Sequence, residues 1–209
     1  MNPQAELAQS IAALNLELAP ETQQKMLDYL ALLKKWNAVY NLTAVAQTEW
    51  VSNHLLDSLA VLPYLWEGRW LDVGCGAGLP GLVLAMACPE WEFTLLDSNS
   101  KKTSFVKQAI IELGLRNAVV CCARAEDWKA NEKFDGIISR AFAEVSAFTI
   151  ATRHLLAAGG RWAAMKGKPE KELQHLPAGV AVEKIVSLDV PGIEAARSLV
   201  ILKATGGEH

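Results

Sequence analysis

The strongest structural signal in this chain is the segment Trp70-Leu71-Asp72-Val73-Gly74-Cys75-Gly76-Ala77-Gly78-Leu79-Pro80-Gly81. An apolar run ends at Val73, glycines follow at alternate positions, and an apolar segment suited to a helix comes next. Glycine lets the backbone turn tightly and approach a ligand without interference from a Cβ atom. The N–H groups at the start of the following helix then face that ligand. The segment therefore predicts a strand, a glycine turn and a helix around a nucleotide-like cofactor.

Two kinds of cofactor compete for this turn. The letters from Gly76 to Gly81 match G-x-G-x-x-G, the pattern of dinucleotide-binding proteins. Read from the end of the strand, however, the pattern is D-V-G-x-G-x-G, which is similar to the S-adenosylmethionine loop of methyltransferases. Pro80 has no N–H to donate to a pyrophosphate, so we favour S-adenosylmethionine, with Gly74, Gly76 and Gly78 as contacts. The alternatives are an NAD-linked oxidoreductase, a cofactor-binding regulator without catalysis, and a turn that binds nothing.

A second apolar run, from Trp91 to Leu96, ends in Asp97. An acid about 20 residues after such a glycine turn holds the ribose diol in Rossmann-type folds. An ionised carboxylate can accept two hydrogen bonds side by side, which suits a vicinal diol. Asp97 is also placed to cap the helix expected from Ser98 to Gly114. One carboxylate can serve both purposes.

Length and composition indicate one enzyme-sized domain with an attached element. The chain has 209 residues, is 51% hydrophobic and carries a formal net charge of −3. It has neither a long apolar run nor a signal-peptide pattern, so we expect no membrane partner. Its four cysteines lack C-x-x-C spacing, which predicts reduced thiols in the cytoplasm and no metal site. The mildly acidic charge argues against general nucleic-acid binding, but it leaves room for a local basic face.

Hydrophobic periodicity divides the chain into two regions. Residues 1–68 are expected to form a helical cap, with helices over Glu6–Leu18, Pro20–Ala38 and Thr48–Leu62. Residues 69–209 alternate between strands and helices. The expected strands are Trp70–Val73, Phe93–Leu96, Val119–Cys122, Gly136–Ser139, Arg161–Met165, Ala181–Leu188 and Leu199–Lys203. The helices between them are Leu79–Ala87, Lys101–Gly114 and Glu144–Leu156. This order predicts an α/β fold with a mostly parallel sheet, helices on both faces, and ligands at the carboxyl ends of the strands.

The ends of the third and fourth expected strands carry further candidates. Ala125-Glu126 follows the third strand, where methyltransferase folds place the adenine, although Glu126 is equally suited to be a solvated first-turn acid. The fourth strand ends in Ser139-Arg140-Ala141-Phe142, not in the Asn/Asp-Pro-Pro-Tyr/Phe of enzymes that methylate exocyclic amines. No cysteine lies there for attack through a nucleophilic thiolate. Arginine is seldom placed at an inward strand end without a role, so Arg140 is a site candidate.

Several motifs then occur together in one order along the chain. They are Lys35-Trp36-Asn37 with Tyr40-Asn41-Leu42-Thr43, His54-Leu55-Leu56-Asp57-Ser58, Asp72 to Gly81, Leu95-Leu96-Asp97-Ser98, Ile138-Ser139-Arg140-Ala141-Phe142 and Lys166-Gly167. The ordered set resembles the bacterial 16S ribosomal RNA guanine-N7 methyltransferases of the RsmG family, also called glucose-inhibited division protein B. The resemblance runs from about residue 20 to Lys203. It departs from the family at Cys75-Gly76-Ala77, where Thr or Ser and often Pro would be expected.

The resemblance implies a class I, Rossmann-like methyltransferase fold with a seven-stranded sheet. It implies S-adenosylmethionine contacts at Gly74, Leu79, the Ala125-Glu126 turn and Arg140. The implied methyl acceptor is a guanine in the decoding region of 16S ribosomal RNA or of the small ribosomal subunit. Guanine N7 has an in-plane lone pair in the neutral base, so in-line alignment suffices and no general base is required. We expect a cytoplasmic monomer without a DNA partner; a small-molecule or protein acceptor is the alternative.

Cations at the strand ends are candidates for contacts to the acceptor. Arg140 and Lys166 are expected to position the reacting base, because Arg and Lys commonly donate to guanine O6. Arg124, Lys166 and Arg197 are expected to contact RNA, and solvated rim charge is the alternative for each of them. His54 and Asp57 lie three residues apart on an expected helix, where they would share a face as a structural hydrogen-bonded pair.

Overall fold

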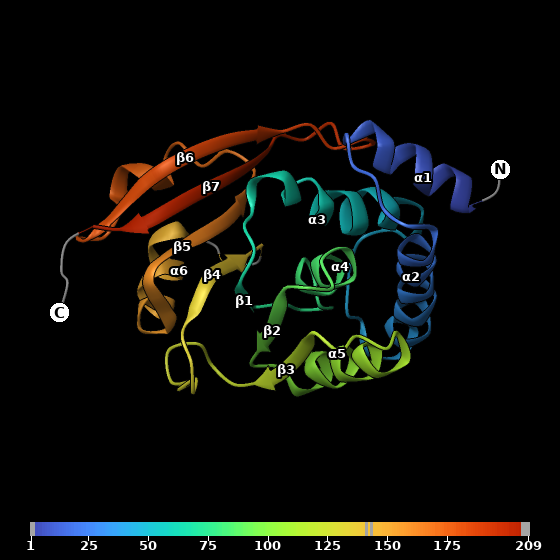
Figure 1. The fold of residues 1–209 in the computed structure, drawn as a ribbon, viewed down its shortest axis with the longest axis horizontal. Helices are drawn as coiled ribbons and strands as arrows, with labels where there is room; N and C mark the ends of the chain where they lie inside the picture. The colour runs from blue at the N-terminus through green and yellow to red at the C-terminus, as the bar shows by residue number, and fades with distance from the viewer. Residues whose placement is uncertain (1–2, 141, 143, 206–209) are drawn as a thin grey trace.

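The structure, a computed structural model, describes residues 3–140, 142 and 144–205 (Figure 1). Ala141, which belongs to the motif at the end of the fourth expected strand, lies outside these residues. Residues 1–2 of the expected cap and 206–209 of the expected sheet region also lie outside them. The strands form one seven-stranded sheet in the order β3-β2-β1-β4-β5-β7-β6. They are β1 Arg69–Val73, β2 Glu92–Asp97, β3 Ala118–Cys122, β4 Phe134–Ser139, β5 Leu156–Lys166, β6 Val180–Leu188 and β7 Arg197–Ala204. β7 runs antiparallel to both β5 and β6, and the other pairs are parallel. The predicted fold class is confirmed.

The order of the strands places a ligand-binding crevice beside β1. The chain runs outward from β1 through β2 to β3, and then returns to β4 on the other side of β1. In such sheets ligands bind at the carboxyl ends of the strands, where the winding reverses. The hydroxyl of Ser139 at the end of β4 donates to the carbonyl oxygen of Val73 at 2.8 Å. The glycine loop and Arg140 therefore leave the sheet side by side.

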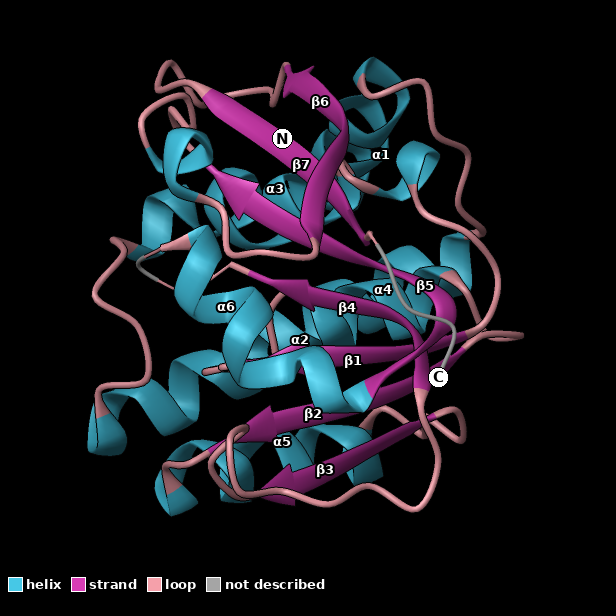
Figure 2. Ribbon diagram, turned by 90° about the vertical axis from the view of Figure 1, so that its left-hand side faces the viewer, coloured by secondary structure: helices cyan, strands magenta, loops and turns pink. Residues whose placement is uncertain are grey.

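Side-chain alternation along the strands creates two apolar layers, since successive residues of a strand face opposite sides of the sheet. Trp70 and Leu95 belong to one buried cluster, whereas Leu71 and Leu96 belong to the other. Helices α4 (Gly81–Ala87) and α5 (Ser100–Glu112) cover the first face together with the cap, and α6 (Val145–Thr152) covers the second (Figures 1 and 2). Helices thus lie on both faces, as the sequence predicts.

The cap consists of two long helices and a composite third element. Helix α1 spans Pro3–Ala13 and α2 spans Pro20–Tyr40, whereas the first helix was expected to continue to Leu18. It ends early because Asn15 adopts a left-handed conformation with φ of 56°, which asparagine tolerates better than most residues. The third expected helix is a 3-10 turn, a π-helical turn over Val51–Leu56 and the α-helical turn α3 over Asp57–Leu59. The division of the chain near residue 68 stays a prediction, because one apolar cluster spans both regions.

Several boundaries in the sheet region differ from the expectation, among them those of two helices and the start of β5. Helix α4 begins at Gly81 and not at Leu79, and the N–H of Gly81 donates to the buried carboxylate of Asp72 at 2.8 Å. Helix α6 ends at Thr152 because the chain passes through a 3-10 turn into β5, which starts at Leu156. Within the described part of the chain, none of the helices combines the length and apolar character needed to cross a lipid bilayer.

Candidate functional site

The glycine loop between β1 and α4 is tied to the neighbouring strand by its backbone. Gly74, Gly76 and Gly78 have φ values of 70°, 57° and 85°, a left-handed conformation that other residues adopt with strain. The N–H groups of Gly74 and Cys75 both donate to the carbonyl oxygen of Leu96, at 2.8 and 3.1 Å. These bonds hold the loop at the carboxyl edge of β2.

Gly76 and Gly78 of this loop have different surroundings. A Cβ atom added to Gly76 would meet only the carbonyl oxygen of Gly74, at 3.9 Å, so Gly76 faces open space. A Cβ atom added to Gly78 would overlap the side chain of Leu82 and lie 3.4 Å from Val106. Gly78 packs closely against α4 and α5 and is not among the residues that line the adjoining cavities, and its expected contact with the cofactor stays a prediction.

Asp97 at the end of β2 anchors the loop. Its Oδ2 accepts from the N–H of Gly76 at 2.9 Å, and its Oδ1 accepts from the N–H of Asn99 at 2.8 Å. Helix α5 is capped by Asn99, whose side chain accepts from the N–H groups of Lys101 and Lys102. The alternative role of Asp97 as the cap of this helix is therefore wrong. Its carboxylate lines a cavity beside the loop.

Two small cavities follow the carboxyl edge of the sheet on either side of this loop. One, of about 260 Å³, is lined by residues that include Asp97, Arg124, Ala125, Glu126 and Phe142. The other, of about 140 Å³, is lined by residues that include Thr43, His54, Gly76, Leu79 and Arg140. Gly74 and Lys102 line both, so the two cavities form one elongated groove, called here the cofactor groove. Every expected cofactor residue except Gly78 lines it.

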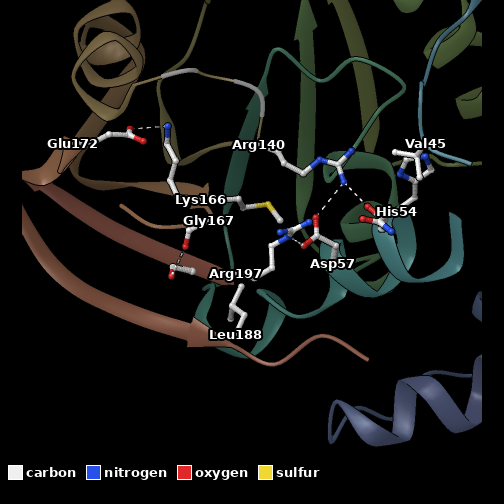
Figure 3. A pocket seen from close by; sticks show the side chains of 12 residues that line it. Val45, His54, Asp57, Arg140, Lys166, Gly167, Glu172, Leu188 and Arg197 are labelled. Atoms are coloured by element: carbon white, nitrogen blue, oxygen red, sulfur yellow. Dashed lines mark hydrogen bonds and ion pairs between the residues drawn. The ribbon is translucent and has the colours of Figure 1, made fainter. Parts of the chain in front are cut away.

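A third cavity, of about 400 Å³, lies next to this groove and is called here the acceptor cavity (Figure 3). Asp57, Lys166 and Arg197 line it, so two of the three cations expected to contact RNA are brought together there. Arg124, the third, lines the cofactor groove instead. Arg140 and His54 line both the acceptor cavity and the groove. These two residues mark the place where the two spaces meet.

Ion pairs in the acceptor cavity join different elements of the fold. Arg140 Nη1 lies 3.3 Å from Asp57 Oδ2 and donates to the carbonyl oxygen of Asn53 at 2.8 Å. Arg197 Nε lies 3.0 Å from Asp57 Oδ1. Lys166 Nζ lies 2.8 Å from Glu172 Oε2 and donates to the carbonyl oxygen of Phe142 at 2.9 Å. The cations at the rim are therefore held in place by acceptors from other elements.

The expected pair of His54 and Asp57 does not form, because each contacts another residue. His54 Nε2 lies 3.2 Å from the hydroxyl of Thr43, whereas Asp57 binds the two arginines. Burial first, and the positive charge of Arg140 second, lower the pKa of His54 to about 4. His54 is thus a neutral imidazole near pH 7, and its low basicity makes it a poor general base there.

Two residues, Asp72 and Tyr29, support the site from beneath, and the sequence-based expectations assign them no role. Asp72 is fully buried in β1, and burial raises its pKa to about 7. Tyr29 of α2 is also buried, and its hydroxyl donates to the carbonyl oxygen of Ala77 in the glycine loop at 2.8 Å. An acid inside an apolar strand is a signal that could have found Asp72. Tyr29 sits in an ordinary apolar helix face, where nothing in the sequence marks it.

Comparisons with known proteins agree with this geometry. A family described as GidB, rRNA small subunit methyltransferase G, matches residues 22–200. A protein of Laribacter hongkongensis named ribosomal RNA small subunit methyltransferase G is 50% identical over 204 residues, which cover 97% of this chain and 99% of that protein. A protein of the same name from Chromobacterium violaceum is 51% identical over 199 residues, covering 94% and 95% of the two chains.

Solved structures with little sequence similarity share the fold. A glycopeptide N-methyltransferase in complex with S-adenosylmethionine has a TM-score of 0.60 at 12% identity, over 74% of this chain and 88% of that chain. A methyltransferase from Geobacter sulfurreducens in complex with S-adenosyl-L-homocysteine has a TM-score of 0.52 at 13% identity, over 83% and 98%. The sheet is that of S-adenosylmethionine-dependent methyltransferases. Because the family match spans residues 22–200 and a relative that is 50% identical aligns over nearly the full length of both chains, the chain belongs to the rRNA small subunit methyltransferase G family.

Proposed function

We propose that this protein transfers a methyl group from S-adenosylmethionine to N7 of a guanine in the decoding region of 16S ribosomal RNA. The observation that carries the proposal is the meeting of the cofactor groove and the acceptor cavity at Arg140 and His54. Family membership supports small-subunit ribosomal RNA as the acceptor. A reaction at this junction must proceed beside a guanidinium and a neutral imidazole, without a strong base.

The residues of the cofactor groove fit S-adenosylmethionine. Asp97 offers a carboxylate for the ribose diol, and Ala125 and Glu126 lie where a backbone N–H and an acid can bind the adenine edge. Gly76, where a Cβ atom would enter open space, leaves room for close approach of the methionine part. The bound cofactor would supply an electrophilic methyl group on its sulfonium. The protein residues bind and orient it.

Guanine N7 suits this site better than an exocyclic amine. The N7 lone pair attacks without prior loss of a proton, so alignment of the base with the methyl group is the main requirement. Arg140 and Lys166 can donate to guanine O6, the commonest contact of these side chains with this base. Arg197 in the same cavity can contact a neighbouring phosphate. An amine acceptor would call for the Asn/Asp-Pro-Pro-Tyr/Phe motif, and the sequence has Ser139-Arg140-Ala141-Phe142 in its place.

The test is transfer of tritium from labelled S-adenosylmethionine to ribosomal RNA from a bacterial strain in which the corresponding gene is deleted. Free RNA and intact small subunits are offered separately, followed by nucleoside analysis. We expect label in the 16S fraction as 7-methylguanosine. Label in another nucleoside would overturn the N7 assignment, and label confined to protein or small molecules would overturn the RNA acceptor. Calorimetry with S-adenosylmethionine and with NAD distinguishes a methyltransferase from an oxidoreductase.

A further inference from the structure

Asp57 joins three separate parts of the chain within the acceptor cavity. It lies in α3 of the cap, whereas Arg140 follows β4 and Arg197 begins β7 (Figure 3). Its side chain is only 4% exposed. One carboxylate oxygen faces Arg140 at 3.3 Å, and the other faces Arg197 at 3.0 Å. Each oxygen is therefore committed to a different guanidinium.

The arrangement has an electrostatic purpose beyond linking the cap to the sheet. Two guanidinium groups on one buried carboxylate repel each other less than they would without it. Hydrogen bonds to a charged carboxylate are directional, so they fix the orientation of both planar groups. A guanidinium has five N–H donors. Arg140 donates to Asn53 and Asp57, and Arg197 donates to Asp57 and Ala196, so the contacts described use fewer than five donors of either arginine. Donors therefore remain for a ligand in the cavity.

We propose that Asp57 is a positioning residue for the methyl acceptor. It orients Arg140 toward the base and Arg197 toward the phosphate next to that base. Arg140 lines the cofactor groove as well as the acceptor cavity, so its guanidinium faces the reacting base. Arg197 lines only the acceptor cavity, which suits a phosphate next to that base. The inference rests on the proposed function in one respect, namely that the acceptor is RNA.

A purely structural ion pair is the competing explanation. Buried ion pairs rarely add much net stability, because the desolvation of the charges offsets their attraction. If Asp57 is only a structural link, replacing it should lower the melting temperature and leave the reaction of the folded protein unchanged. If Asp57 acts through the arginines, replacing it should change the reaction, and the change should depend on whether those arginines are present.

The test compares D57N, R197A and the double variant D57N/R197A in single-turnover methyl transfer at saturating cofactor. Asparagine keeps the shape but loses the charge that orients both guanidiniums. We expect D57N to lower the rate about tenfold or more. The double variant should lose less than the product of the two single losses, because only the contact of Asp57 with Arg140 remains to be disturbed once Arg197 is removed. D57E, which restores the carboxylate, should recover part of the rate. A parent-like rate for folded D57N, or losses that multiply in the double variant, would overturn the proposal.

The matched control is E183Q. It removes the carboxylate of the Arg161–Glu183 pair between β5 and β6, which lines neither the groove nor the acceptor cavity. Its rate should stay within about twofold of the parent. If circular dichroism shows that D57N does not fold, R197K takes its place. Lysine keeps the positive charge, but its ammonium lacks the planar fork of N–H donors with which arginine can bind a carboxylate and a ligand together. Parent-like RNA affinity and rate in R197K would then overturn the proposal. Total tritium in 16S RNA is the readout, so an error about N7 is detected separately, by nucleoside analysis.

Discussion

Asp72 makes the stability of this protein depend on pH in an unusual direction. Burial raises its pKa to about 7, so in the folded state it stays protonated where the unfolded chain is already ionised. Between pH 4 and 7 the unfolded state then binds fewer protons, and the free energy of unfolding falls as pH rises. His54 acts in the opposite direction, because its lowered pKa of about 4 makes stability rise with pH up to its unfolded value near 6.5.

The variant Asp72→Asn separates these two contributions. Asparagine can still accept the hydrogen bond from Gly81, but it does not titrate. We expect urea unfolding to show the parent losing stability relative to the variant as pH rises from about 4 to about 7, with no further change above that. Parallel curves for the two proteins across this range would show that Asp72 ionises normally in the folded state.

Asp97 and Asn99 allow a matched comparison of ligand binding with helix capping. Asp97→Ala should weaken S-adenosylmethionine binding by about 1–3 kcal/mol, because polar partners are left unpaired. Asn99→Ala removes the cap of α5 and should cost about 1 kcal/mol of stability, with little change in cofactor affinity. Calorimetry and thermal unfolding of both variants provide the measurement. Equal affinities for parent and Asp97→Ala, with only a lower melting temperature, would assign Asp97 a structural role.

At the scale of secondary-structure elements, the glycine loop provides the clearest test of where the cofactor lies. Gly76→Val should abolish S-adenosylmethionine binding while the protein stays folded, because the added side chain enters the open space of the groove. Gly114→Val is the matched control, since Gly114 has a similar φ of +63° and nothing within 4 Å of an added Cβ atom. Both variants carry comparable backbone strain. Near-normal affinity of the Gly76 variant in calorimetry would refute this placement of the loop.

The sequence predicts the elements of the sheet well and the composite third cap element poorly. Strand positions follow from apolar runs bounded by turns, and the carboxyl ends of parallel strands share one edge, which is why most of the groove could be predicted. The expected helix over Thr48–Leu62 contains a π-helical turn instead, and periodicity near 3.6 residues does not distinguish such a turn from an α-helix. The start of β5 was missed because Ala157 to Gly160 are alanines and glycines, which have weak strand preference.

The acceptor cavity could be predicted only in part, because its contacts join residues far apart in the chain. Asp57 lies 83 residues from Arg140 and 140 from Arg197. The expected strand ends predict that Arg140 and Lys166 lie at the rim, but no spacing rule connects Arg140 to an acid in the cap. The assignment of Arg140 and Lys166 to positioning of the base stays a prediction, as does the assignment of Arg124, Lys166 and Arg197 to RNA contacts.

For the whole molecule, Arg140 and Lys166 should affect different stages of the reaction. Lys166 lines only the acceptor cavity, so Lys166→Ala should lower RNA affinity or single-turnover rate and spare cofactor affinity. Arg140→Ala should reduce both, because Arg140 also lines the groove. Loss of such a positioning donor typically costs about 2–4 kcal/mol of transition-state stabilisation. Parent-like turnover in both variants, with unchanged melting temperatures, would move the RNA contacts to Arg124 and Arg197.

The bond from the Tyr29 hydroxyl to the carbonyl oxygen of Ala77 ties the cap to the glycine loop. Detaching α2 would leave that buried carbonyl without its donor, at a cost of about 1–3 kcal/mol. We therefore expect local opening of the cap to be coupled to disorder of the loop. We expect a molecule that binds the loop to slow hydrogen exchange in α2 around Tyr29 as well, so that binding in the groove also stabilises the cap.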